Sequence, residues 1–433
     1  MKIPSLTLVR QELEQPAIAD IPGEVQRQWQ TSGLSQRFRR GAGVAVAVGS
    51  RGIANLAVIV RATVDWLRDQ GTQPFIVAAM GSHGGGTLEG QREILASYGI
   101  TEEALRVPVR TEMTTVEIGK NSWNEPVLWD KNAWEADAVV TISRVKAHTD
   151  FRGRTESGII KMLAIGLGKR DGAAQHHRWG VRGLRDMIPA SARVIVEKSR
   201  FLGGLAILEN SSDQTAVLRA VHRDELFTVE PVLLEQAKAL MGRLPFDHLD
   251  LLVIGEIGKN YSGAGIDPNV VGRLLMEGEP EFEKPRITRI CALDLSPESH
   301  GNGTGVGIAD LTTNRLLGKI QQTPFRMNNL TSCFLWRSKI PFSFPTDREC
   351  IEAGVASCWQ PKFDDLRMAI IPNTLELSEL WVSPALVEEI KAKPFLKIYG
   401  EPQEAPFHST GFLRQTALFP QCHRARRGES RRS

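Results

Sequence analysis

The sequence lacks the cysteine patterns that mark several classes of protein. Only five of its 433 residues are cysteine, and no two of them have Cys-x-x-Cys spacing. This scarcity argues against an iron–sulfur cluster held by the chain, because such clusters need several closely organised thiolates. An odd number of cysteines without metal-ligand spacing is typical of reduced thiols, so we expect a cytoplasmic protein.

Long apolar runs are also missing. No stretch approaches the ~20 consecutive apolar residues of a membrane span. Residues 1–20 mix apolar and charged side chains and do not form the apolar core of a signal peptide. The sequence therefore predicts no association with a membrane.

Clustered positive charge is absent from most of the chain. The formal net charge of +3 comes largely from Arg424–Ser433, and the rest of the sequence is close to neutral. A nucleic-acid-binding protein needs a clustered basic face, so we expect no nucleic acid as partner. Residues 414–433 are predicted to be a basic, disordered tail, with contact to an acidic surface as the alternative.

Several short catalytic motifs do not occur. There is no Walker-type phosphate loop, no His-Glu-x-x-His helix and no Gly-x-Ser-x-Gly elbow. The glycine-rich stretch Gly301–Gly307 misses the third-glycine spacing of a dinucleotide fingerprint. A nicotinamide-dependent oxidoreductase is therefore the weakest of the enzyme classes considered.

What the sequence does contain is the composition of a globular protein, with 42% hydrophobic and 24% charged residues. A chain of this length is too long for one ordinary core, so we expect two domains. We predict an N-terminal catalytic domain over residues 1–240 and a C-terminal α/β domain over residues 241–413.

The predicted elements alternate between short apolar strands and amphipathic helices. In the first half we expect strands that are each followed by a polar or glycine-rich loop. We also expect two amphipathic helices there, and Thr87 is the predicted N-cap of the second helix. The second half repeats the pattern, with two short helices expected over Leu375–Lys391. The sequence thus predicts the α/β class, with two α/β domains, mainly parallel sheets and ligands at the carboxyl ends of the strands. The expected strands are Gly43–Val48, Pro74–Ala79, Ala138–Ile142, Leu249–Ile254, Arg289–Leu293 and Leu366–Ile371, and the expected helices of the first half are Ala54–Gln70 and Thr87–Tyr98.

Two of these loops are candidate binding sites. Gly49-Ser50-Arg51-Gly52 lies between a strand and a helix, where backbone N–H groups and the Arg51 guanidinium favour a phosphate or carboxylate; a tight turn is the alternative. His83 lies in Gly81–Gly86, where glycines let the backbone approach a ligand and the imidazole can carry a proton.

The richest segment runs from Val145 to His177. It places His148, Lys161 and the pair His176/His177 in one short window, in a chain with only nine histidines. Imidazole carries protons near neutral pH and binds metals, and a lysine amine is a point charge or a covalent handle. From this segment alone, a Lys161 amine that extends outward to solvent is the more usual arrangement.

The ordered set of these residues resembles the nickel-dependent lactate racemase family, over roughly residues 10–400. The set is Ser50-Arg51 after a strand, then Gly-Ser-His83, His148, Lys161 and a histidine sixteen residues later. The similarity is strongest to the branch described only by its lactate racemase domain, in the segments Val44–Asn55, Ala79–Gly90, Val145–Lys169 and Glu256–Asn269.

The resemblance implies two α/β domains with an active-site cleft between them and a nickel pincer nucleotide as cofactor, supplied by cofactor-biosynthesis enzymes. It implies Lys161 as the covalent tether and His177 as the nickel ligand, with His176 not distinguished from it by sequence. Lys169 is the alternative tether.

The implied activity is a racemase or epimerase of a 2-hydroxy acid, an isomerase that works by hydride transfer through the cofactor. His83 and His148 would be the acid–base pair. Ser50 and Arg51 would contact the cofactor, and Arg51 also the substrate. Lys259 (cofactor) and Arg273 (substrate) lie where the family places a further cationic contact. The small-molecule substrate is the expected partner.

The sequence departs from the family pattern in two places. Val48 stands where lactate racemases usually have an aspartate, three residues before Arg51, and the interval from His148 to Lys161 is longer than in lactate racemases. Lactate is therefore only one candidate among 2-hydroxy acids. A non-catalytic protein of the same fold that binds a nucleotide or phosphorylated ligand is the alternative.

Overall fold

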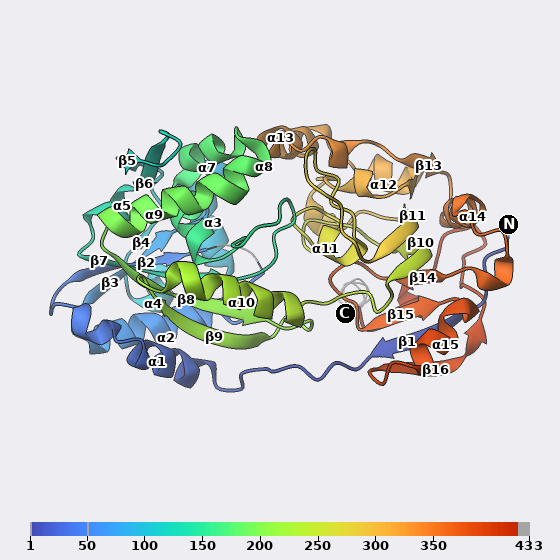
Figure 1. The fold of residues 1–433 in the computed structure, drawn as a ribbon, viewed down its shortest axis with the longest axis horizontal. Helices are drawn as coiled ribbons and strands as arrows, with labels where there is room; N and C mark the ends of the chain where they lie inside the picture. The colour runs from blue at the N-terminus through green and yellow to red at the C-terminus, as the bar shows by residue number, and fades with distance from the viewer. Residues whose placement is uncertain (1, 50–51, 423–433) are drawn as a thin grey trace. The chain divides into compact units, whose positions relative to one another are not determined.

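The computed structural model describes residues 2–49 and 52–422, so Met1, Ser50, Arg51 and residues 423–433 lie outside the described part. The chain divides into two compact units (Figure 1), one formed by Gln15–Met241 and the other by Met1–Glu14 with Gly242–Ser433. Both units are built from a mainly parallel sheet with helices, so the predicted α/β class is confirmed. No helix of the described residues is long and apolar enough to cross a membrane.

The unit of Gln15–Met241 is built on a six-stranded sheet in the order β4-β3-β2-β7-β8-β9. All neighbouring strands are parallel except β8 and β9, which form an antiparallel pair. The strands are β2 (Gly43–Val48), β3 (Gln73–Ala78), β4 (Val109–Arg110), β7 (Ala138–Arg144), β8 (Phe201–Glu209) and β9 (Thr215–His222).

Helices cover both faces of this sheet because its strands alternate apolar side chains to the two sides. On one face, Val44, Val46 and Ile142 pack with residues of α1 and α2 in a single core cluster. On the other, α6 approaches β8 closely, since a Cβ on Gly204 would lie 3.0 Å from the Cδ1 atom of Ile159. The helices of this unit are α1 (Ile21–Thr31), α2 (Leu56–Asp69), α3 (Leu88–Ser97), α4 (Glu102–Leu105), α5 (Lys131–Glu135), α6 (Ile159–Lys161), α7 (Lys169–His177), α8 (Gly180–Arg182), α9 (Ile188–Lys198) and α10 (Leu226–Leu240), beside a hairpin of β5 (Thr115–Lys120) and β6 (Pro126–Asp130).

The second unit has an eight-stranded sheet in the order β13-β12-β11-β10-β14-β15-β1-β16. The first five strands in this order are parallel to their neighbours, and the remaining pairings are antiparallel. The strands are β1 (Leu6–Gln11), β10 (His248–Ile254), β11 (Arg286–Ala292), β12 (Leu311–Thr313), β13 (Phe342–Phe344), β14 (Met368–Ile371), β15 (Glu379–Val382) and β16 (Leu396–Gln403), with helices α11 (Pro268–Val271), α12 (Asn314–Gly318), α13 (Gln322–Ser332), α14 (Asp347–Ser357), α15 (Val387–Lys391) and α16 (Gln415–Leu418).

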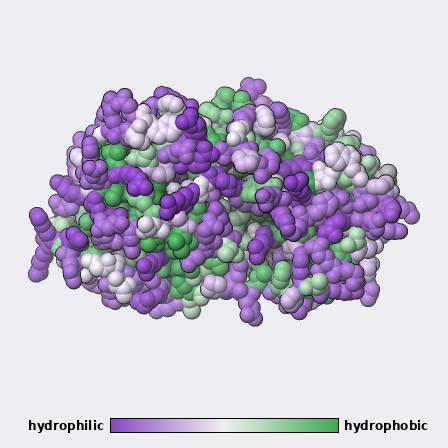
Figure 2. All heavy atoms as spheres, in the orientation of Figure 1, coloured by the Kyte–Doolittle hydropathy of each residue, from purple (hydrophilic) through white to green (hydrophobic). Residues whose placement is uncertain are grey.

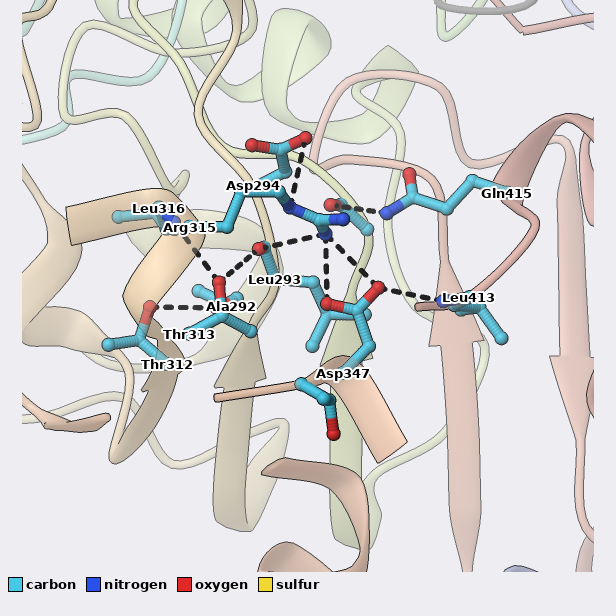
Figure 3. A network of polar contacts seen from close by, with 12 residues as sticks. Ala292, Leu293, Asp294, Thr312, Thr313, Arg315, Leu316, Asp347, Leu413 and Gln415 are labelled. Atoms are coloured by element: carbon cyan, nitrogen blue, oxygen red, sulfur yellow. Dashed lines mark hydrogen bonds and ion pairs between the residues drawn. The ribbon is translucent and has the colours of Figure 1, made fainter. Parts of the chain in front are cut away.

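A buried ionic network ties the carboxyl end of β11 to α12 and α14 (Figure 3). The Arg315 guanidinium donates to both oxygens of Asp347, at 2.8 and 3.1 Å, and pairs with Asp294 on its other side. Asp347 also accepts the Leu413 N–H at 2.8 Å. The network therefore fastens the last part of the described chain to the sheet.

Three predictions need correction. The first domain does not begin at residue 1, because β1 pairs with β15 and β16 in the other unit. The expected helix pair over Leu375–Lys391 is wrong in its first half, which forms β15.

The tail prediction is the third. Residues 414–422 are ordered, since α16 forms and Leu418 and Phe419 are buried in the core of the second unit. The remainder of the predicted tail lies outside the described residues.

On the visible face, hydrophilic side chains predominate in both units (Figure 2).

Lys169 lies in the core of the first unit rather than at a reactive position. Its side chain is 1% exposed, forms an ion pair with the fully buried Asp130 at 2.9 Å and donates to the Ala78 carbonyl at 2.6 Å. These contacts join α7 to β6 and β3. A structural role accounts for Lys169, and we do not retain it as a covalent tether.

Replacing Lys169 with methionine should destabilise the protein by about 3–5 kcal/mol, because it leaves the buried Asp130 carboxyl without its cation. Chemical denaturation measures the change. Lys131→Met is the matched control: Lys131 pairs with Glu135 across an exposed helix surface, so its loss should cost about 0–1 kcal/mol. Equal effects of the two substitutions would contradict a structural role for the buried pair.

Candidate active site

The candidate site lies at the carboxyl ends of three neighbouring parallel strands. β2 is flanked by β3 and β7, and the loops that follow these strands carry the predicted residues. Ligands of open α/β sheets bind at such ends. The loop after β2 contains Ser50 and Arg51, whose predicted cofactor and substrate contacts fall outside the described residues.

His148 lies in the loop after β7, and residues that follow it in the same loop hold its side chain. Its Nδ1 accepts the backbone N–H of Asp150 at 3.0 Å, and its ring lies 4.6 Å from the ring of Phe151. The side chain is only 11% exposed. The imidazole is thus fixed in orientation, with Nε2 as its remaining ring nitrogen.

That nitrogen meets Lys161. The Lys161 Nζ lies 2.5 Å from His148 Nε2, although 13 residues separate them in sequence. Lys161 is the last residue of α6, which continues into a π-helical turn over Met162–Gly166. This turn and α6 pack on the sheet through Met162, whose sulfur accepts the Ser143 hydroxyl at 3.1 Å.

The hydrogen bonds of His148 determine which group carries the proton. A neutral imidazole has one N–H, and here Nδ1 is the acceptor, so the proton resides on Nε2. Nε2–H can bond only to an acceptor, and an ammonium group has none. The geometry therefore fits Lys161 as a neutral amine, the form that acts as a nucleophile.

Burial acts in the same direction. It lowers the pKa of Lys161 to about 8, with Asp150 and Glu156 opposing the shift. Burial, followed by the charge of Lys161, holds the pKa of His148 well below its usual range. At neutral pH the imidazole is consequently neutral, and an appreciable fraction of the amine is free to react.

The two adjacent histidines of α7 have different surroundings. His176 is buried, and its two ring nitrogens contact the Gly172 carbonyl at 2.7 Å and the Ser191 hydroxyl at 3.0 Å. His177 instead has a buried Nδ1 with no hydrogen-bond partner among the described residues. Burial and the nearby charge of Lys161 lower the pKa of His177 to about 4. His177 is therefore a neutral imidazole with unused capacity beside Lys161.

His83 follows β3 at the same edge of the sheet, and its side chain is exposed. The Gln91 amide donates to the Gly81 carbonyl at 2.9 Å, and the Thr87 side chain caps α3 as predicted. The structure thus brings His148, Lys161 and His177 into one cluster, with His83 on a neighbouring loop.

Two residues of the second unit, Lys259 and Arg273, are predicted to contact the cofactor and the substrate, and their surroundings differ. Lys259 follows β10, where its amine donates to the Gly263 carbonyl. Arg273 donates to the carbonyls of Ile287 and Ile308 at 2.8 and 3.0 Å and pairs with Asp310 at 2.8 Å. Because its guanidinium is engaged within its own unit, we correct its predicted role from substrate contact to structural residue.

Sequence reasoning missed two acidic residues of this site, Glu156 and Glu230. The buried Glu156 accepts the His148 N–H, and the buried Glu230 accepts an N–H at the start of α6. Glu230 could have been noticed, because it interrupts an apolar helical stretch. Glu156 has no comparable signal in the Arg-rich loop around it.

Comparisons with known proteins agree with the fold. The solved structure of the lactate racemase apoprotein from Thermoanaerobacterium thermosaccharolyticum is similar, with a TM-score of 0.52 and 12% sequence identity, over 86% of this chain and 99% of that chain. At this identity the likeness establishes a lactate-racemase-like fold and nothing further. Residues 43–235 match the model of a family described as a domain of unknown function, DUF362. No curated protein matches the sequence.

The amine of Lys161 should react with a small acylating reagent with a midpoint near pH 8, since burial lowers its pKa to about 8. Below this pH the amine is protonated and unreactive. Peptide mass spectrometry after brief treatment with acetic anhydride gives the rate at each pH. Lys362, 79% exposed, provides the internal reference. The same pH profile for both lysines would contradict the assignment.

Proposed function

We propose that this protein is an isomerase that racemises or epimerises a 2-hydroxy acid, with a nickel pincer nucleotide as cofactor. The observation that carries the proposal is the contact between the Lys161 amine and His148 Nε2, beside the unused His177 imidazole. The lactate-racemase-like fold supports it.

The residues present fit such a cofactor. Lys161, as a neutral amine, suits a covalent link, and His177, as a neutral imidazole, suits nickel. Among the described residues, no three His, Cys, Asp or Glu side chains gather closely enough to hold a metal ion. His177 would therefore share the nickel with ligands of an organic group, as in a pincer complex. When bound, that group supplies reversible hydride transfer.

A covalent link at Lys161 also explains how His148 becomes available. An amide-type nitrogen is a poor acceptor, so the His148 imidazole would lose the amine as its partner and could face the substrate hydroxyl. Its low pKa keeps it neutral, and Nε2 accepts the hydroxyl proton once the ring N–H has moved to Nδ1 and the contact with the Asp150 N–H has broken. Inversion needs a proton carrier on each face of the carbon, and His83 is the second one we propose.

Arg51 is the residue we propose for the substrate carboxylate, because a guanidinium binds a carboxylate through two parallel hydrogen bonds. Val48, at the end of β2, is fully buried. Its side chain is apolar, so it does not supply the carboxylate that lactate racemases usually have at this position. A 2-hydroxy acid larger than lactate, or a sugar acid, fits this difference at least as well as lactate does.

The same difference supports a second candidate function. Without that carboxylate, the loops could hold a nucleotide or phosphorylated ligand with no turnover. The two candidate functions differ in what they require of His83 and His148, because only catalysis needs these histidines as proton carriers.

The test is to produce the protein beside the cofactor-biosynthesis enzymes and to measure nickel and the mass of the Lys161 peptide. The loaded protein is then assayed with a panel of chiral 2-hydroxy acids. We expect one nickel per chain, an added mass on Lys161, and an activity that His83→Asn or His148→Asn lowers by about 10²–10⁴-fold.

Active protein with an unmodified Lys161 would remove the tether. Full nickel loading without racemisation of any acid in the panel would oppose the enzyme. Ligand affinity unchanged by either asparagine substitution, with no turnover to lose, would favour the binding protein.

A further inference from the structure

Helix α10 contacts both segments that carry the reactive side chains. It is the last helix of the first unit, and two of its residues, Glu230 and Lys238, face the segments of Lys161 and His148. Neither residue belongs to the predicted chemistry, yet both take part in buried polar contacts. Buried charges are retained only where they are paired or hydrogen-bonded.

The first contact holds the loop of His148 through Glu156. The side chain of Glu156 is 0% exposed, its Oε2 accepts the His148 backbone N–H at 2.6 Å, and Lys238 of α10 reaches its Oε1 at 3.1 Å. A backbone pairing of Lys146 with Ser157 closes the loop at its base. Glu156 thus fixes where the loop places His148, and Lys238 compensates its buried charge.

The second contact holds the start of α6. Glu230 is fully buried, and its Oε2 accepts the Ile160 N–H at 3.0 Å, one of the N–H groups that a helix leaves without an internal partner. The carboxyl lies against Gly158, where a Cβ would come within 2.6 Å of the carboxyl carbon of Glu230 and would displace it. The carboxyl therefore fixes the helix turn from which Lys161 extends.

We propose that α10 sets the mutual position of the two reactive groups, with Glu156, Lys238 and Glu230 as positioning residues for His148 and Lys161. The inference rests on the proposed function for what the pair does, but the contact between them is measurable without it. Hydrogen bonds to the backbone act on the loop and the helix turn, so their loss moves the side chains without removing any reactive atom.

The first experiment breaks the tie between α10 and the His148 loop. Lys238→Met leaves Glu156 buried without its cation, while the matched control Glu235→Gln removes only the exposed partner of Lys238 on α10. Ring ¹⁵N signals of histidine-labelled apoprotein report the tautomer of His148. We expect a single Nε2–H tautomer in the wild type and the control, and its loss in Lys238→Met.

In loaded enzyme, Lys238→Met should lower kcat about tenfold or more with little change in KM, since small misplacements of a catalytic group are costly. Unchanged His148 signals and unchanged kcat in Lys238→Met would overturn the proposal. If the wild-type protein racemises nothing, the proposed function fails, and the ¹⁵N signals of the apoprotein still decide the positioning role.

The second experiment addresses Lys161. Burial raises the pKa of Glu230 to about 7, so glutamine imitates its protonated form and keeps an acceptor for the Ile160 N–H. Glu230→Gln should preserve the fast acylation of Lys161 in the apoprotein, whereas Glu230→Leu should slow it several-fold. Equal rates in folded samples of both variants would overturn the role of Glu230.

Discussion

The hydrogen bond between His148 and Lys161 is the interaction on which the site depends. It joins the loop after β7 to the end of α6, and with Nδ1 as an acceptor it fits an Nε2–H imidazole and a neutral amine. Burial makes that arrangement favourable, because a charged ammonium at this place would lose its hydration. The lowered pKa of Lys161 thus follows from exclusion of water rather than from an unusual residue.

The surrounding structure maintains this contact through buried acids and backbone N–H groups. Glu156 and Glu230 each hold a main-chain N–H, and each lies within reach of α10 or belongs to it. The charge of Glu156 also acts on the Lys161 amine, since it opposes part of the lowering of the Lys161 pKa by burial. The first unit thus keeps carboxylates near the reactive pair as supports for the backbone.

The fold gives this cluster its location. Parallel strands β3, β2 and β7 end at one edge, so loops that are far apart in the sequence carry side chains to the same region. The likeness to a lactate racemase structure concerns this framework. The proposed activity depends on a few side chains, of which His148, Lys161 and His177 are close together. At neutral pH both imidazoles are neutral and a fraction of the Lys161 amine is free.

Hydrophobic pattern alone determined the strands β2, β3, β7, β10, β11 and β14, because a buried parallel strand is apolar along its whole length. Pattern failed for β1, β15 and β16. β1 pairs with β15 and β16 from the other end of the chain, and local pattern does not show such a long-range pairing. Sequence also placed His148, Lys161 and the two histidines in one window.

Tertiary structure alone decided which of the candidate side chains are already engaged in hydrogen bonds and ion pairs. Hydrogen bonds within the fold engage His176, Lys169 and Arg273 and leave His177 with a ring nitrogen unused. A residue type specifies what a side chain can do, but its burial and its partners determine its protonation and its availability. These depend on neighbours that the chain brings together only when it folds.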